Sequence, residues 1–313
     1  MFNNKILLGQ IIALVVVCFL ISLVILNTNL PEQVKDLTVA KILPGSAEPV
    51  TISAEQTLNI EPVVILLVPG HDSFSKGGFF RELYEEEITL ELAKYLADNL
   101  QADKRFKVVT TRDFTTGDYT DEFLTYFTNA ETQIESFKQQ AKQTMKSLLA
   151  TGTVDEVEPI IQHNEVGKTT GFRLYGINKW ANDHKVDLAL HIHFNDHPRE
   201  FHDNVGKYTG FAMYVPEQQF TNASSSRQVA EKLLTSLSVV SATSTFPSEA
   251  GTIIESQDLI ATGANNSQTH PAVLVEYGYI YEPQYYLAGK RAKSLPLLAE
   301  QTHQGLIKYF FGK

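Results

Sequence analysis

Short runs rich in β-branched and aromatic residues alternate with helical patterns from Pro62 onward, and this alternation limits the fold more than any other feature. Such alternation is typical of a twisted, mostly parallel sheet with helices on both faces. We therefore predict a single α/β domain over residues 62–313. The predicted strands are 63–68, 106–111, 187–194, 210–215 and 272–276, and the predicted helices are 83–100, 174–181, 229–237 and 288–311.

Residues 114–165 interrupt this alternation and look inserted. Apolar residues there follow helical spacing and predict one amphipathic helix: Ile134, Phe137, Ala141, Met145 and Leu148. Gly152 and an acidic stretch follow. Two interpretations stay open, an extra helix packed on the domain with a surface loop, or a lid over one edge of the sheet.

The amino-terminal part of the chain carries a separate signal. Residues 6–26 read ILLGQIIALVVVCFLISLVIL, which contains no charge. About 20 residues of helix cross a bilayer core, and the run exceeds the roughly 7–15 apolar residues of a signal peptide. We predict a short cytoplasmic segment at 1–5, a single-pass transmembrane helix at 6–26 and a linker at 27–61. Lysines on both sides of the span leave its orientation open on charge alone.

Composition narrows the classes of function. Hydrophobic residues make up 43% of the chain, which is enough for a buried core. The formal net charge is −10, which argues against a nucleic-acid partner, because such proteins normally present a basic surface. The only cysteine, Cys18, lies in the predicted span, so the domain has neither a disulfide nor a thiol nucleophile.

Polar side chains follow several of the predicted strands where each one ends. "VVILLVPGHDS" ends in His71, "VDLALHIHFND" carries His191, His193 and Asn195, and "PAVLVEYG" carries Glu276. "KVVTTRD" adds Arg112. Ligands bind at the carboxyl ends of the strands in open parallel sheets. A carboxylate at the end of an apolar strand also needs a partner, so we expect these groups to form one site.

Two histidines and one carboxylate form a common catalytic zinc set, with water as the fourth ligand. The carboxylate is expected near a helix start, where "YEEEITLELAKYL" offers Glu85, Glu86 and Glu87. Simpler interpretations remain open for each group. The three glutamates favour a helix start by charge alone, His71 can be a turn residue, His191 can be a core histidine, and Glu276 can cap the next turn.

Four ordered blocks resemble the zinc-dependent N-acetylmuramoyl-L-alanine amidases of the type-3 amidase group, which are bacterial cell-wall hydrolases. The blocks are "VVILLVPGHDS", "EEEITLELAKYLADNL" with "FKVVTTRD", "GINKWANDHKVDLALHIHFND" and "PAVLVEYGYIYEP". The resemblance covers about residues 62–311, with 114–165 inserted. Two departures stand near the first block, since Val68 replaces the usual aspartate and Asp72-Ser73 replace two glycines.

The resemblance implies a role for each matched residue. His71, Glu85 and His193 match the zinc ligands, and Glu276 matches the catalytic glutamate. The residues expected to contact substrate or support the ligands are Arg112, His191, Asn195 and His270.

The implied activity is hydrolysis of the amide between N-acetylmuramic acid and L-alanine of peptidoglycan, with Zn²⁺ as cofactor. That substrate lies outside the cytoplasmic membrane, so the domain is expected to face the periplasm or cell wall. As a lid, residues 114–165 would be removed by a protein activator, and Glu156 or Glu158 would occupy the open metal position until then. The alternatives are an inactive peptidoglycan-binding or sensor domain and a different zinc amide hydrolase.

Overall fold

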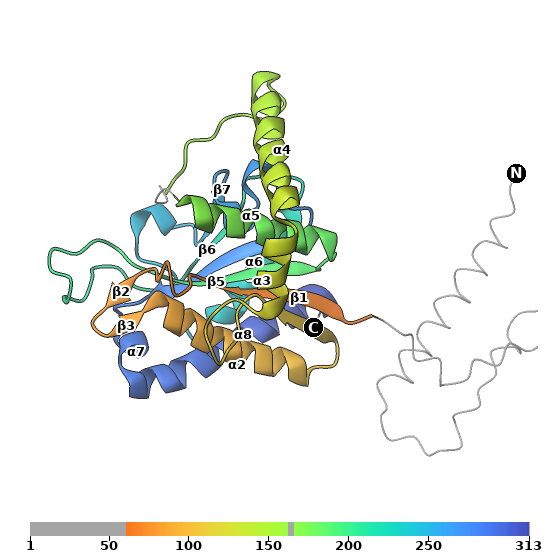
Figure 1. Cartoon of the computed structure of the whole chain (residues 1–313). Helices are drawn as coiled ribbons and strands as arrows, with labels where there is room; N and C mark the ends of the chain where they lie inside the picture. Colours follow the sequence, from red (N-terminus) through yellow and green to blue (C-terminus); the bar gives the residue numbers. More distant parts are fainter. Residues whose placement is uncertain (1–60, 162–165, 313) are drawn as a thin grey trace, which may run out of the picture. The chain divides into compact units, whose positions relative to one another are not determined.

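The computed structural model describes residues 61–161 and 166–312 (Figure 1). The predicted segment 1–5, the predicted span 6–26 and all of the predicted linker but Glu61 lie outside these residues. Within the described part of the chain, no helix combines the length and the apolar character needed to cross a membrane.

A six-stranded sheet in the order β4-β1-β5-β8-β6-β7 forms the centre of the domain. β4, β1, β5 and β8 are parallel, whereas β6 runs antiparallel to β8 and β7 runs parallel to β6. The strands are β1 (Val63–Pro69), β4 (Phe106–Thr110), β5 (Leu188–Asn195), β6 (Ala212–Pro216), β7 (Ile253–Ser256) and β8 (Ala272–Tyr279). The mostly parallel sheet is confirmed, with β7 as an unpredicted edge strand.

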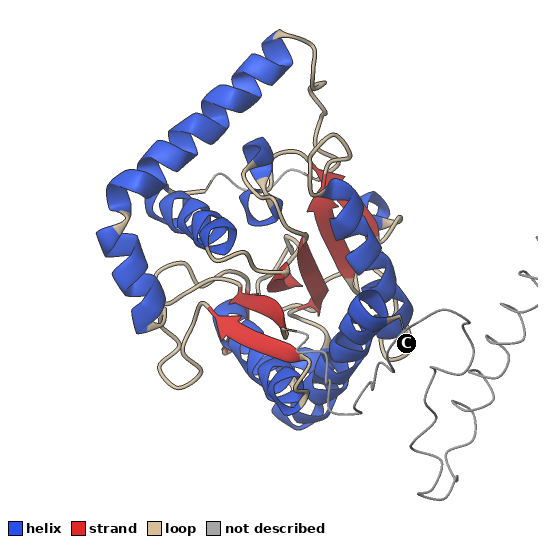
Figure 2. Ribbon diagram, turned by 90° about the vertical axis from the view of Figure 1, so that its right-hand side faces the viewer, coloured by secondary structure: helices blue, strands red, loops and turns tan. Residues whose placement is uncertain are grey.

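Helices cover the sheet on both faces, as predicted (Figures 1 and 2). α2, α6 and α8 pack against one face, and α5 with the inserted α3 and α4 covers the other. Side chains alternate along β1 accordingly, because Ile65 and Leu67 join the first core and Leu66 and Val68 the second. The helices are α2 (Glu85–Ala102), α3 (Asp121–Asn129), α4 (Glu131–Ala150), α5 (Lys168–Asp183), α6 (Ala223–Leu237), α7 (Pro283–Tyr286) and α8 (Ala288–Phe311).

Short elements complete the chain around this frame. A two-stranded hairpin joins β2 (Phe79–Phe80) to β3 (Leu83–Tyr84) between the end of β1 and the start of α2. Three 3-10 turns, η3 (Pro247–Glu249), η4 (Ile260–Thr262) and η5 (Ala264–Asn266), lie on either side of β7 in the sequence. None of these carries enough apolar periodicity for prediction from sequence, because each is only two or three residues long.

The insertion is a packed layer with two helices, where the sequence predicted one. Phe123 of α3 is fully buried, with its ring centroid 4.9 Å from that of Trp180 on α5. Ile134 of α4 is buried in the same cluster, which also contains Val68. Val68 therefore faces the apolar cluster to which the inserted helices contribute.

The segment after α4 is held far from the lid position. The backbone N–H of Asp155 donates to Gln219 and that of Val157 donates to Gln257. Gln219 and Gln257 follow β6 and β7, which end at the edge opposite to the carboxyl ends of β1, β5 and β8. The side chains of Glu156 and Glu158 are exposed. Neither belongs to a metal-ligand cluster in the structure.

Phe123→Ala tests whether the insertion is part of the core. Removing this ring leaves a cavity beside Trp180, so the free energy of unfolding should fall by about 3–5 kcal/mol. The neighbouring Leu124 is 43% exposed and serves as the control, since Leu124→Ala should change stability by less than about 0.5 kcal/mol. Urea denaturation measures both, and equal effects would show that α3 is not packed as described.

Candidate metal centre

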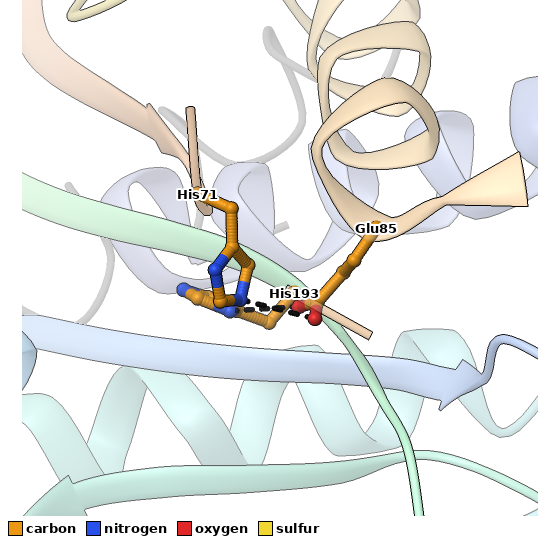
Figure 3. Close-up of side chains that lie close together, drawn as sticks. All are labelled: His71, Glu85 and His193. Atoms are coloured by element: carbon orange, nitrogen blue, oxygen red, sulfur yellow. Dashed lines mark hydrogen bonds and ion pairs between the residues drawn. The ribbon is translucent and has the colours of Figure 1, made fainter. Parts of the chain in front are cut away.

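Three side chains from separate elements meet at the carboxyl edge of the parallel strands. His71 follows β1, Glu85 is the first residue of α2, and His193 lies near the end of β5. One potential ligand atom from each lies within 4.8 Å of the other two (Figure 3). Among the described residues this is the only such cluster of three or more histidine, cysteine or acidic side chains.

Glu85 stands between the two histidines. Its Oε2 lies 3.0 Å from His71 Nε2, and its Oε1 lies 3.0 Å from His193 Nδ1. The backbone N–H of Gly78 donates to Oε2 at 2.8 Å, and that of Phe194 donates to Oε1 at 3.2 Å. Each carboxylate oxygen is therefore fixed by the backbone and faces an imidazole.

Burial and charge act in opposite directions on these groups. Burial disfavours ionisation of Glu85, but the two histidines outweigh it and hold the pKa of the carboxyl well below its usual range. Burial also disfavours a charged His71, but Glu85 reverses this and raises its pKa. At His193 burial prevails over Glu85 and lowers the pKa. An ionised carboxylate beside a neutral imidazole is the protonation state in which both bind metal ions.

The backbone at His71 adopts a conformation that suits a functional residue. Its φ is 65°, in the left-handed region that non-glycine residues rarely occupy. Its Nδ1 lies 3.1 Å from the carbonyl oxygen of Ser75, which leaves Nε2 to face the cluster. Metal-binding histidines commonly hold their second nitrogen in this way.

Asp72 stabilises that loop, which explains one departure from the family pattern. Its carboxylate accepts hydrogen bonds from the backbone of Phe74 and Ser75, both at 2.9 Å. It also forms a 2.6 Å ion pair with Arg173 of α5. The loop that presents His71 is thus tied to the helix layer that covers this face of the sheet.

Two glycines leave room for the cluster. A Cβ on Gly70 would lie 2.4 Å from Cε1 of His193, and one on Gly77 would lie 2.5 Å from Glu85 Oε2. Gly77 also has a φ of 73°, which favours glycine. Only glycine fits at either position without moving a ligand.

Arg112 is buried and supports two ligands from behind. Its guanidinium donates to the carbonyl oxygens of Gly70, at 3.3 Å, and Glu86, at 3.1 Å. Those residues are the direct neighbours of His71 and Glu85. A further bond to the carbonyl of Gly117, at 2.7 Å, fixes the guanidinium itself. Arg112 thus supports the backbone next to two of the three clustered residues.

The structure resolves the register of the three acidic residues at the start of α2. Glu85 points into the cluster, whereas Glu86 pairs with Arg112 at 3.4 Å. Glu87 accepts from the backbone N–H of Tyr84 at 2.9 Å and so caps the helix.

Glu276 lies beside His193, because the two residues are paired across β5 and β8 and their side chains share one face. Burial, followed by the charges of Glu85 and Glu249, raises the pKa of Glu276 well above its ordinary value. Its Oε2 is buried and accepts no hydrogen bond from any described residue. A basic carboxylate with a free oxygen is suited to proton transfer, although a bound cation would oppose the rise in its pKa.

His191 and His270 do not belong to the ligand cluster. His191 is paired with Val68 and Leu274 in the interior of the sheet, where burial lowers its pKa to about 3 and keeps the ring neutral. His270 precedes the amino end of β8, whereas Glu276 lies toward its carboxyl end. Burial lowers the pKa of His270 to about 4. The structure does not add either ring to the three ligands.

The hydrogen-bond partner of Asn195 is Glu249, a residue that the sequence did not suggest. The side-chain amide of Asn195 donates to Glu249 at 2.8 Å, so its direct contact is an acid and not the ligand cluster. Glu249 is 1% exposed although it lies in the turn-like stretch "FPSEAG". That stretch resembles any surface turn, and nothing in it indicates burial.

The donor set fits a zinc-type ion. Two imidazoles and one carboxylate leave a fourth position open for water. The His71 ring is held from outside the cluster by the carbonyl of Ser75, and Gly70 and Gly77 provide space that any Cβ would fill. The unpaired Oε2 of Glu276 lies on the strand next to His193.

Comparison with known proteins agrees with this geometry. Residues 65–307 match the family model of the N-acetylmuramoyl-L-alanine amidases. The chain belongs to this family. Its match contains the three predicted metal ligands and Glu276, and it spans the insertion as well. A search of curated proteins finds no significant match.

Solved structures show the same fold. Ami1 from Mycobacterium smegmatis, an N-acetylmuramyl-L-alanine amidase, aligns with a TM-score of 0.52 at 14% identity, over 82% of this chain and 100% of its own. The CwlD amidase from Clostridioides difficile, solved in complex with the GerS lipoprotein, aligns with a TM-score of 0.51 at 15% identity, over 80% and 100%. At these identities the likeness concerns the fold of this amidase.

Gly70→Ala tests the close approach of the loop and His193. The added Cβ must displace the imidazole, so zinc affinity should fall at least about tenfold while the protein stays folded. Gly289→Ala is the control, because nothing lies within 4 Å of a Cβ there. Titration calorimetry with Zn²⁺ measures both variants, and unchanged affinity in Gly70→Ala would contradict the ligand geometry.

Proposed function

We propose that this amidase uses Zn²⁺ to hydrolyse the amide bond between the lactyl group of N-acetylmuramic acid and L-alanine in peptidoglycan. The observation that supports the proposal most directly is the cluster of His71, Glu85 and His193 beside Glu276. His71, Glu85 and His193 would hold the ion. When bound, zinc would supply Lewis acidity toward the amide carbonyl and toward water.

Glu276 performs the proton transfers in this proposal. Its free Oε2 takes a proton from the water that attacks the amide carbon. The same oxygen then delivers that proton to the departing amine of L-alanine as the carbon–nitrogen bond breaks. Water is thereby divided between a new lactyl carboxyl group and a free amino group.

The surrounding residues keep these groups aligned. Arg112 and Asp72 hold the His71 loop from two sides, and both are buried. Such fixed geometry matters because misplacement by about 1 Å can cost roughly 100-fold in rate. The extent of this support favours a working enzyme over an inactive wall-binding domain on the same fold.

We also propose a membrane location for the enzyme. Residues 6–26 are long and apolar enough to anchor a chain, and residues 27–61 are long enough to extend toward the wall. The substrate lies outside the cytoplasmic membrane, so the catalytic domain would face the periplasm or cell wall. Protease accessibility in intact spheroplasts tests the orientation, and full protection of the domain would contradict it.

A protein activator that acts on residues 114–165 remains a prediction. CwlD was solved with the GerS lipoprotein, which makes a protein partner a reasonable expectation for an amidase of this fold. Because the segment after α4 is fastened to Gln219 and Gln257, such a partner would contact a layer that is already packed.

Glu276→Ala tests the catalytic assignment. The variant should release less than about 1% of the wild-type amount of stem peptide from purified peptidoglycan, because it removes the one buried carboxylate oxygen among the described residues that accepts no hydrogen bond. Its zinc content should equal that of the wild type. Mass spectrometry of the digest identifies the bond that is cut, since only an amidase leaves intact glycan and free stem peptides. Retained hydrolysis would refute the role of Glu276, and cleavage of another amide would refute the substrate.

Metal removal tests the cofactor independently of activity. At zinc concentrations of about 100 times the dissociation constant, binding should add roughly 2.7 kcal/mol to the free energy of unfolding. Treatment with a chelator should remove this stabilisation, and added Zn²⁺ should restore it. Calorimetric unfolding of the wild type and of His71→Ala provides the comparison. A wild type that zinc does not stabilise would contradict the proposed centre.

A further inference from the structure

Glu249 is a buried carboxylate that the proposed reaction does not use. It lies in η3 and is 1% exposed. Its Oε1 accepts hydrogen bonds from the Asn195 amide at 2.8 Å and the Tyr214 hydroxyl at 2.7 Å. Its Oε2 accepts from the Tyr279 hydroxyl at 3.1 Å and from the Ser244 hydroxyl. Four donors compensate the cost of burying the charge.

Three of the four donors come from three neighbouring strands, and the fourth, Ser244, lies in the loop between α6 and η3. Asn195 ends β5, Tyr279 ends β8 and Tyr214 lies in β6, and these strands are adjacent in the sheet. Glu249 therefore joins the strands that carry the catalytic groups.

A β-bulge lies between the catalytic groups and this carboxylate. His193 pairs with Glu276, but the next pair is Asn195 with Tyr279, so β8 carries one extra residue there. The residue before Tyr279 is Gly278, with a φ of 155°. A bulge interrupts the ladder of hydrogen bonds and changes the direction of the side chains beside it. Strand pairing alone therefore fixes the two ends less firmly at this point.

Glu249 binds the two residues that pair immediately beyond the bulge. The Asn195 amide approaches it from one strand and the Tyr279 hydroxyl from the other. The backbone bond from Ile280 N–H to the Asn195 carbonyl, at 2.9 Å, closes the same connection. The carboxylate thus bridges the ladder where its regular bonds are interrupted.

We propose that Glu249 is a positioning residue of this amidase. By holding Asn195 and Tyr279 together across the bulge, it fixes the ends of β5 and β8 and hence the spacing between His193 and Glu276. Tyr214 extends the same hold to β6. The inference rests on the proposed function of Glu276, but the clamp itself is a property of the fold and can be measured without catalysis.

Glu249→Gln tests the clamp with nearly unchanged volume. The new amide NH₂ replaces an oxygen that accepts two hydrogen bonds and faces their donors instead. On a soluble muropeptide, kcat should fall at least tenfold, while KM stays within twofold and the zinc content is unchanged.

Glu217→Gln is the matched control. Glu217 is also buried, at 3% exposure, and it follows β6 at the opposite edge of the sheet. It accepts a hydrogen bond from the Gln219 backbone within its own turn. This variant should keep kcat within twofold. A normal kcat in Glu249→Gln, or an equal loss in both variants, would overturn the proposal.

Hydrogen exchange separates this inference from the proposed function. In Glu249→Gln, amides of residues 194–196 and 277–281 should exchange at least about tenfold faster than in the wild type. Glu217→Gln should leave these segments unchanged. A wild type that released no stem peptide would refute the proposed function. Amide hydrogen exchange would still test whether Glu249 holds β5 and β8 together. Unchanged exchange at these amides would overturn the clamp whatever the activity.

Tyr279→Phe provides a milder second variant in case Glu249→Gln does not fold. It removes one donor and no packing volume of note, so kcat should fall about threefold and exchange at 277–281 should rise. A normal kcat together with normal exchange in Tyr279→Phe would also overturn the proposal.

Discussion

The buried charge of Glu85 is the constraint on which the site depends. It is 5% exposed and would be costly to bury without partners. Its partners are the backbone of Gly78 and Phe194 and the rings of His71 and His193. These contacts tie the loop after β1, the start of α2 and the end of β5 to one carboxylate. A metal ion would replace mutual attraction between acid and imidazole with coordination, while the backbone bonds keep the acid in place.

The apolar sheet makes this concentration of polar groups possible. β1, β5 and β8 are buried on both faces and run parallel, so their carboxyl ends meet at one edge. The pairing of His193 with Glu276 follows from the register of β5 and β8. Beyond that pair the bulge interrupts the regular ladder of backbone hydrogen bonds. There, side-chain hydrogen bonds connect β5 and β8. Glu249 accepts these bonds, whereas Arg112 supports the backbone beside His71, and both are buried ionic groups whose partners are named above.

The departures of this chain from its family pattern have physical reasons. Val68 belongs to the apolar cluster that also contains residues of α3, α4 and α5 on this face of the sheet. Asp72 closes the turn after His71 and pairs with Arg173 of that same layer. Both changes therefore fit the helix layer on this face, since Val68 belongs to its apolar cluster and Asp72 pairs with Arg173 of α5. The segment that contains Glu156 is bound at the far edge, which gives the packed-layer interpretation its support.

The sequence by itself predicted the main strands and helices and the parallel edge where polar groups gather, and the family resemblance matched His71, Glu85, His193 and Glu276 to functional residues. Apolar periodicity indicates which residues are buried, and polar residues that follow apolar strands indicate the carboxyl edge of the sheet. Both patterns can be recognised within short stretches of sequence. The tertiary structure decided what depends on distant partners. It selected Glu85 over Glu86 and Glu87, because only Glu85 reaches both rings. It revealed α3, the direction of β6 and the burial of Glu249, since a polar turn becomes an interior anchor only when three strands bring donors to it.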